Sequence, residues 1–240
     1  MSKERLGSLI SGGGTTMREI VLACRSGLIP LDPACVISSD PKASGIEKAK
    51  KLGVRTAVVD PNNFRTQSGV VDQESFGLEI KKILLKHGVS VVTQNGWMPL
   101  TPEVVIDEYK SLMFNQHPGP VPEFGGKGMY GRRVHAARLL FVRNTQNRDP
   151  WTLAIAQKVD KDFDKGKVVE EQRVDISPND TVDDLQQRVL SAEYAVQIRL
   201  LQNFCSGNLR DLPERKLVLK GEEHILFEAR RNARFLYPHG

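Results

Sequence analysis

Two polar segments of this chain carry side chains that could perform chemistry. Residues 114–119 (Phe-Asn-Gln-His-Pro-Gly) end one apolar run, and residues 162–166 (Asp-Phe-Asp-Lys-Gly) follow another. Because such runs deliver polar residues to the carboxyl edge of a sheet, we expect Asn115, His117 and Asp164 to meet there. An amide N–H and an imidazolium can hold a developing oxyanion, while a carboxylate keeps the imidazole protonated and oriented. The trio therefore predicts acyl transfer to an amine.

Each residue of the trio also has a structural interpretation that spacing alone leaves open. Asn115 could cap a turn, and His117 could be a hydrogen-bonded core histidine. Asp164 could be a solvated turn carboxylate, because aspartate is common in turns. Asp160 and Asp162 lie close enough to be mistaken for the functional acid, but we expect them to alternate or point outward relative to Asp164.

A second candidate site follows the first predicted strand. Gly12, Gly13 and Gly14 precede Thr15 and Thr16, and the next residues have a helical pattern. Backbone N–H groups at a helix N-terminus attract anions, so we expect this loop to bind a phosphate monoester. The alternative is a tight strand-to-helix turn with Thr15 as its cap.

Other nucleotide-binding motifs fit the loop less well. No Gly-Lys-Ser/Thr follows at the spacing of a Walker loop. Met17 stands where a dinucleotide fingerprint needs its third glycine. Asp40, at the end of the second predicted strand, keeps the dinucleotide alternative open because an acid there could bind a ribose.

Apolar runs alternate with helix-like segments along the chain, which is typical of a parallel sheet with crossover helices. We therefore predict an α/β fold with a three-layer, mostly parallel twisted sheet and helices on both faces, as in Rossmann-like proteins. The predicted strands are 9–10, 35–37, 56–59, 89–93, 112–114, 151–159 and 167–174. The predicted helices are 17–24, 45–52, 74–86, 104–106 and 131–143, and residues 144–150 form a predicted surface turn.

The C-terminal part begins with a predicted helix that opens at Thr181. Its apolar or small positions step by three and four: Val182, Leu185, Val189, Ala192, Val196 and Leu200. Glu193 lies on the edge of this stripe, where a carboxylate costs stability unless it is paired or binds a ligand. In the tail, 217–219 and 225–227 predict a closing hairpin or edge strands.

The composition is that of an ordinary globular protein, with 240 residues, 40% hydrophobic and 26% charged. No segment reaches the roughly 18 apolar residues of a membrane span, and we expect a cytoplasmic protein. Three widely spaced cysteines predict reduced thiols and no metal site. The net charge of +5 is scattered, which predicts anionic small molecules as partners and no nucleic acid. The basic cluster Lys127, Arg132, Arg133 and Arg138 predicts a solvated helix face.

Taken together, these motifs resemble the folate-dependent phosphoribosylglycinamide formyltransferases. The resemblance covers roughly residues 1–205 and rests on the glycine-threonine loop at 9–16, Asn115-Gln-His117-Pro, Asp164-x-Gly166, and Glu193. It implies a single formyltransferase-like domain over 1–240, with a phosphate-binding half at 1–110, a catalytic and folate-binding half at 111–205, and a tail at 206–240. It also implies 10-formyltetrahydrofolate as the formyl donor, glycinamide ribonucleotide as the acceptor, and a monomer or homodimer.

The resemblance also implies a role for each matching residue. Gly14, Thr15 and Thr16 would bind the 5′-phosphate in a turn shaped by Gly12 and Gly13, and Glu193 would bind the ribose hydroxyls. Asn115 would hold the formyl oxygen, His117 would act as general acid, and Asp164 would pair with His117 and relay a proton through water. The implied folate contacts are Trp97, Met98, Pro99, Leu100, Val159, Asp160 and Asp164.

The chain departs from the family pattern on the donor side. The segment 119–131 is longer and richer in glycine, Gln157 replaces a frequent histidine, and Lys165 and Lys167 alter the usual Asp-Gly-Gly-Pro turn. Pro99 stands in a segment whose backbone often contacts the pterin. The rival functions are a formyltetrahydrofolate hydrolase, a formyltransferase for another amine, and a nucleotide-binding oxidoreductase or binding module that leaves His117 idle.

Overall fold

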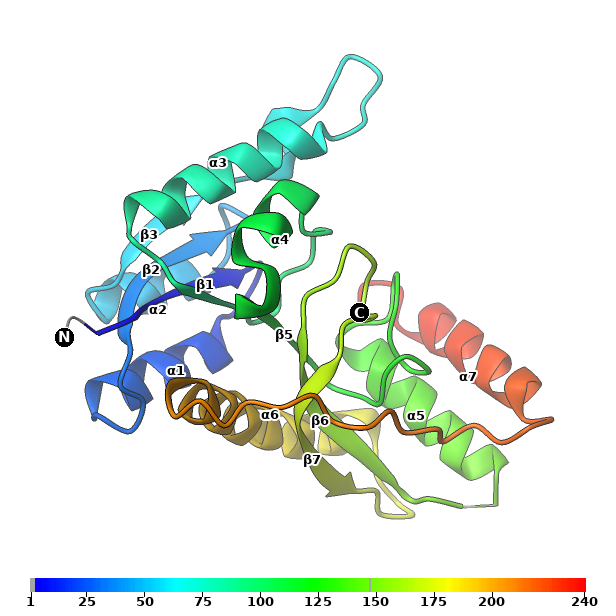
Figure 1. The fold of residues 1–240 in the computed structure, drawn as a ribbon. Coiled ribbons are helices and arrows are strands. Elements are labelled where there is room, and N and C mark those ends of the chain that lie inside the picture. The colour runs from blue at the N-terminus through cyan, green and yellow to red at the C-terminus, as the bar shows by residue number, and fades with distance from the viewer. Residues whose placement is uncertain (1–2, 147) are drawn as a thin grey trace. The chain divides into compact units, whose positions relative to one another are not determined.

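The computed structural model describes residues 3–146 and 148–240 (Figure 1). Residue 147, within the predicted turn 144–150, lies outside the described residues. The strands are β1 (Arg5–Ile10), β2 (Asp32–Ser38), β3 (Arg55–Val58), β4 (Val91–Gln94), β5 (Met113–His117), β6 (Trp151–Lys158) and β7 (Val168–Asp175). The helices are α1 (Thr15–Arg25), α2 (Gly45–Lys51), α3 (Gln73–Lys86), α4 (Glu103–Tyr109), α5 (Arg132–Asn144), α6 (Val182–Cys205) and α7 (Glu223–Leu236), with the short 3-10 helices η1 (Pro61–Phe64) and η2 (Lys110–Leu112).

In the described part of the chain the strands form a seven-stranded sheet in the order β3-β2-β1-β4-β5-β6-β7. The pairs β1–β2, β1–β4, β2–β3 and β4–β5 are parallel, whereas β6 and β7 are antiparallel. This mostly parallel sheet with crossover helices confirms the predicted fold class.

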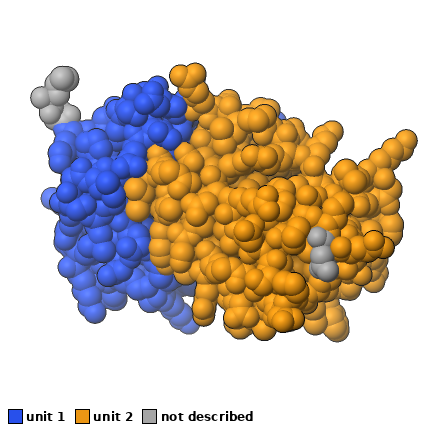
Figure 2. Space-filling view, turned by 90° about the horizontal axis from the view of Figure 1, so that it is seen from below, with its two compact units in different colours: residues 1–116, 158–161, 200–209 blue, residues 117–157, 162–199, 210–240 orange. Residues whose placement is uncertain are grey.

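Packing divides the chain into two compact units (Figure 2). Unit 1 contains residues 1–116, 158–161 and 200–209, and unit 2 contains residues 117–157, 162–199 and 210–240. The expected functional division at residues 110 and 205 stays a prediction, because the units are defined by packing and not by ligands.

Unit 1 has apolar side chains on both faces of its strands. On one face, Ile10 of β1 packs with Met17 and Val21 of α1. On the other face, Leu9 belongs to a cluster that contains Phe76 of α3 and Val105 of α4. Because neighbouring residues of a strand point to opposite faces, Leu9 packs against helices on one face of the sheet and Ile10 against a helix on the other. The three-layer arrangement follows from this double burial.

The predicted hairpin in the tail is wrong. Residues 223–236 form the helix α7, and 217–219 form no strand. Ala229 and Ala233 are buried against α5, and Ile225 and Leu226 are half-buried on the same side. Their spacing of three and four residues is helical, and two alanines allow the helices to approach closely. Three consecutive apolar residues, Ile225-Leu-Phe227, are typical of a strand, and the helical spacing becomes visible only when Ala229 and Ala233 are included.

The predicted solvated face of α5 is also wrong at one position. Arg138 is fully buried, and its guanidinium donates hydrogen bonds to the carbonyl oxygens of Trp151 (2.8 Å) and Asp149 (2.7 Å). It also lies 5.3 Å from the ring centroid of Phe124. These groups take the place of water around the cation. Burial lowers the pKa of Arg138 to about 10, so it stays charged at neutral pH.

Candidate active site

His117 and Asp164, which the sequence predicts to meet, lie together in unit 2. His117 is the last residue of β5, and Asp164 lies in the turn between β6 and β7. The distance from His117 Nδ1 to Asp164 Oδ1 is 3.6 Å, which is within ion-pair range but longer than a hydrogen bond. Their side chains are 5% and 8% exposed, so the pair is largely shielded from water. The interpretation of Asp164 as a solvated turn carboxylate is therefore wrong.

Asp164 is held at both of its carboxylate oxygens. Gln157 Nε2 donates to Oδ1 at 2.7 Å, and the backbone N–H of Gly126 donates to Oδ2 at 2.8 Å. Asp164 has φ +57°, in the left-handed region that aspartate tolerates better than most residues. The sequence marked Gln157 only as a departure from the family pattern and gave no sign of Gly126. Their contacts fix the orientation of the carboxylate.

Both nitrogens of the His117 ring face acceptors. Nε2 lies 3.1 Å from the carbonyl oxygen of Phe124, and Nδ1 faces Asp164. A ring that carries protons on both nitrogens can donate to both groups. The buried His135 on α5 has a different environment. Its burial, with a smaller contribution from repulsion by His117, lowers its pKa to about 3. His135 is therefore neutral at pH 7.

Asn115 lies on β5 two residues before His117, opposite Gln94 of β4, and is half-buried. Residues two apart on an extended strand point to the same side of a sheet. The expected strand positions of Asn115 and His117 are thus confirmed. A contact between Asn115 and a formyl oxygen stays a prediction.

The glycine loop between β1 and α1 leads into the N-terminus of α1. Gly14 is the N-cap of α1 with φ +59°, and Gly12 and Gly13 are exposed. Gly45 packs against the loop, where its N–H donates to the Gly12 carbonyl at 3.0 Å. Lys48 Nζ donates to the Gly13 carbonyl at 2.7 Å and adds a cation beside the loop. The sequence alone does not predict this contact, because nothing in the spacing of Lys48 points to residue 13.

The two threonines of the loop differ in exposure. Thr15 is exposed, whereas Thr16 is buried and its hydroxyl accepts a hydrogen bond from Gln116 Nε2 at 3.3 Å. Gln116 Oε1 in turn accepts from Asn95 Nδ2 at 3.1 Å. The Thr16 side chain thus connects α1 to β5 within unit 1, and its role in phosphate binding stays a prediction.

The predicted folate contacts fall into both units. Trp97 is buried in unit 1, where its ring stacks on Phe76 with centroids 6.2 Å apart, and half-buried Val159 packs against the same core. Their neighbours Met98 (42% exposed), Pro99, Leu100 (37% exposed) and Asp160 also belong to unit 1. Asp164 belongs to unit 2. The exposed side chains are accessible to a ligand, whereas Trp97 mainly supports the core.

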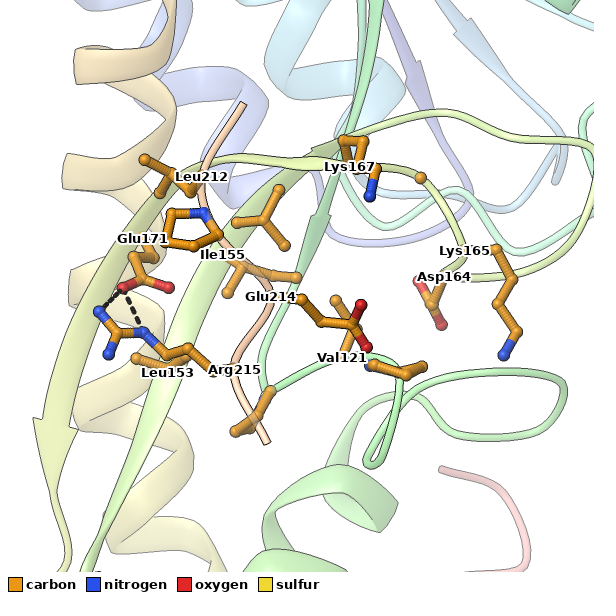
Figure 3. Close-up of a pocket in the computed structure, with 15 residues that line it drawn as sticks. Val121, Leu153, Ile155, Asp164, Lys165, Lys167, Glu171, Leu212, Glu214 and Arg215 are labelled. Carbon is orange, nitrogen blue, oxygen red and sulfur yellow. Dashed lines mark hydrogen bonds and ion pairs between the residues drawn. The ribbon is translucent and has the colours of Figure 1, made fainter. Parts of the chain in front are cut away.

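A cavity of about 240 Å³ lies beside Asp164 in unit 2 (Figure 3). Its lining includes Lys165 and Lys167, and Figure 3 shows Lys165 next to Asp164 in the turn. Arg215 of the tail forms an ion pair with Glu171 across part of the lining. Asp164 is the one predicted folate contact in this lining.

Glu193 lies on α6 within the predicted buried stripe and is 7% exposed. Burial raises its pKa to about 8. At neutral pH, the Glu193 carboxyl group is therefore uncharged in most of the protein molecules. A ribose that donates hydrogen bonds to it would favour the carboxylate, so the predicted role of Glu193 is chemically consistent with its position.

Among residues 3–146 and 148–240, no group of three or more His, Cys, Asp or Glu side chains is arranged to hold a metal ion. Cys24 and Cys35 are buried free thiols, and Cys205 is a half-buried one. Burial raises the pKa of Cys24 to about 12, which makes it a weak nucleophile. Of the helices that the structure describes, none is long and apolar enough to cross a membrane.

Comparisons with known proteins point to one family. A family model described as formyl transferase matches residues 4–201. Phosphoribosylglycinamide formyltransferase of Haemophilus influenzae is 28% identical over 207 residues, which cover 86% of this chain and 90% of that protein. The chloroplastic phosphoribosylglycinamide formyltransferase of Arabidopsis thaliana is 26% identical over 208 residues, or 87% of this chain and 68% of that protein. The crystal structure of glycinamide ribonucleotide transformylase 1 from Symbiobacterium toebii superposes with a TM-score of 0.73 at 26% identity, covering 88% of this chain and 95% of that one.

Proposed function

The chain belongs to the formyl transferase family, and we propose that it transfers a formyl group from 10-formyltetrahydrofolate to the amine of glycinamide ribonucleotide in purine synthesis. The names of its relatives support this acceptor. The observation that carries the proposal is the buried pair of His117 and Asp164, held by Gln157 and Gly126. A shielded imidazole with an oriented carboxylate is suited to moving protons during acyl transfer.

In the proposed step, the substrate amine bonds to the formyl carbon and the carbonyl becomes a tetrahedral oxyanion. Asn115 donates an amide N–H to the oxyanion, and the His117 imidazolium donates a ring N–H to it. As the bond to the folate nitrogen breaks, His117 supplies the proton that this nitrogen takes up. Asp164 keeps the imidazole oriented and accepts the proton released by the amine through a water molecule. The oxyanion re-forms a carbonyl as that bond breaks, and the proton on Asp164 passes to His117, so the protons balance and the pair is restored.

Separate residues bind the two substrates in this proposal. The N–H groups of the loop at Gly14, Thr15 and Thr16 hold the 5′-phosphate, with the Lys48 ammonium close by. Glu193 accepts hydrogen bonds from the ribose hydroxyls. The proposed donor contacts are the accessible side chains near Met98 and, separately, Asp164 of the catalytic pair.

We further propose a cytoplasmic enzyme that acts as a monomer or homodimer on two small molecules, without a metal, nucleic acid or membrane. The unpaired cysteines support a reducing compartment. The net charge of +5 supports anionic substrates of this kind.

The test is the dependence of folate turnover on the acceptor. Purified protein is mixed with 10-formyltetrahydrofolate, and the loss of the formyl group is followed spectroscopically with and without glycinamide ribonucleotide. The proposal predicts turnover only when the ribonucleotide is present. Turnover without an acceptor would identify a hydrolase, and a lack of folate turnover together with tight binding of a nicotinamide dinucleotide would identify an oxidoreductase.

A further inference from the structure

The glycine-rich loop of residues 119–131 carries two backbone groups that contact His117 and Asp164. The carbonyl of Phe124 faces His117 Nε2 at 3.1 Å, and the N–H of Gly126 donates to Asp164 at 2.8 Å. The intervening Gly125 lies so close that a Cβ on it would be 2.7 Å from Asp164 Cβ. The positions of both catalytic side chains therefore depend on the path of three consecutive loop residues.

Arg230 of α7 holds this same stretch of the loop. Its Nη1 donates to the carbonyl of Glu123 and its Nη2 to the carbonyl of Gly125, both at 2.8 Å. These two carbonyls flank Phe124. The planar guanidinium fork can bind both at once, which a single-point donor cannot do.

The charge and burial of Arg230 fit this function. Arg230 is half-buried. Its burial is the larger cause, and repulsion from Arg234 the smaller cause, of a lowered pKa, whereas attraction to Asp164 raises the pKa. The side chain is thus within electrostatic reach of the catalytic acid. Its guanidinium donates to loop carbonyls, so Arg230 acts on Asp164 through the loop backbone and through its positive charge.

Other contacts fix α7 and the tail relative to the loop. Arg234 donates to the carbonyl of Lys127 at 2.9 Å. Glu123 Oε1 accepts from the N–H groups of Leu217 and Val218 at 2.9 and 3.0 Å. The tail and α7 lie beyond residues 4–201, the part matched by the formyl transferase model. This chain therefore supports its catalytic pair with an element outside the matched region.

We propose that Arg230 is a positioning residue, which fixes the backbone at residues 123–126 and so holds His117 and Asp164 in the geometry for formyl transfer. The inference rests on the proposed function for its kinetic consequence. Its structural part, the link from α7 to the His117 ring, is independent of which reaction the pair performs.

The experiment compares three substitutions in the full chain. Arg230→Met keeps an apolar stem but removes the donors, and Arg230→Lys restores a cation without the planar two-pronged donor. Arg231→Met is the matched control, because Arg231 is exposed on the same helix and pairs with Glu228. For each protein, kcat and KM are measured together with the NMR shifts of the His117 ring nitrogens, assigned through His117→Asn.

For Arg230→Met we expect kcat to fall about tenfold or more, since small displacements of reacting groups are costly, while KM for the ribonucleotide changes less than about twofold. We expect the His117 ring shifts to move, Arg230→Lys to recover part of both effects, and Arg231→Met to match the parent protein. Unchanged ring shifts in Arg230→Met, or equal changes in Arg231→Met, would overturn the inference. If Arg230→Met does not fold, the same comparison is made with Arg230→Lys, whose ring shifts must then differ from those of Arg231→Met. Absence of turnover in the parent protein would instead refute the proposed function, and the ring shifts would still decide the role of Arg230.

Discussion

Asp164 is the residue at which most contacts of the candidate site meet. The sequence predicts its pairing with His117, because both follow apolar runs that end at one sheet edge. The sequence does not predict its contacts with Gln157 and Gly126. Those contacts depend on the folded paths of a strand end and a glycine loop, and no residue type or periodicity in the sequence specifies such paths.

Substitution of His117 or Asp164 tests whether the proposed catalytic pair acts in the chemical step and not in ribonucleotide binding. We expect His117→Ala and Asp164→Asn each to lower kcat on the order of 100-fold or more, because an oxyanion donor or its orienting carboxylate is lost. Calorimetric binding of glycinamide ribonucleotide should persist in both. Asp162→Asn is the control, an exposed acid in the same turn. Loss of ribonucleotide binding in the two variants would contradict the assignment.

The hydrogen bond from Gln157 to Asp164 should matter for turnover. Gln157 is 1% exposed, and its amide donates at 2.7 Å to a carboxylate oxygen. A hydrogen bond to a charged group contributes about 1.5–3 kcal/mol, so Gln157→Leu should lower kcat by roughly tenfold or more. The exposed Gln187→Leu on α6 provides the comparison. Equal kcat values for the two variants would show that the contact has no catalytic effect.

Glu193 should give the protein a measurable pH dependence of stability. Burial raises its pKa from 4.5 to about 8, so the folded protein holds a proton that the unfolded chain releases. This contribution to the free energy of unfolding is complete below about pH 4.5 and is lost as the pH rises through about 8. Glu193→Gln should lack this decline.

Urea unfolding of both proteins across that pH range provides the measurement. His135, whose pKa is lowered to about 3, acts in the opposite direction below its ordinary value of 6.5. It is present in both proteins, so its contribution cancels in the difference. A stability difference that stays constant with pH would show that Glu193 is ionised in the folded, ligand-free protein.

At the scale of elements, helices and strands with strong periodicity are predictable, and the tail is not. α6 begins within one residue of its predicted start, because its buried positions step by three and four. The stripe of α7 consists partly of small residues, Ala229 and Ala233, which hydrophobic patterns weight weakly. Their burial depends on packing against α5, a tertiary contact that the local sequence does not specify.

The close packing of α3 on α4 predicts that a larger side chain at Gly77 destabilises the protein. A Cβ at Gly77 of α3 would lie 2.4 Å from Val104 Cγ1 and 2.6 Å from Pro102 Cβ. Gly→Ala inside a helix ordinarily adds up to about 1 kcal/mol of stability, but overpacking costs about 1–3 kcal/mol. We expect Gly77→Ala to lower the free energy of unfolding in a denaturant titration. Leu78→Ala, at a 49% exposed neighbour, should lower it less, and a stabilised Gly77→Ala protein would contradict the packing.

At the scale of the whole molecule, the order of elements is enough to predict the fold class. Alternating apolar runs and helical segments require crossover connections, which produce parallel strands with helices on both faces. The sequence does not predict the division into two compact units, because distant segments such as 158–161 and 200–209 join residues 1–116. Which distant segments pack together is decided by side-chain fit, which periodicity does not encode.

Movement of a formyl group from a folate to a ribonucleotide amine can be followed with an isotopic label. The most direct measurement uses 10-formyltetrahydrofolate with an isotopically labelled formyl carbon and follows the label by mass spectrometry in the presence of glycinamide ribonucleotide. We expect one labelled formyl group on the ribonucleotide for each folate consumed, and almost none with the Asp164→Asn protein. Label released as free formate, or label that stays on the folate, would show that the chain is not a transferase for this amine.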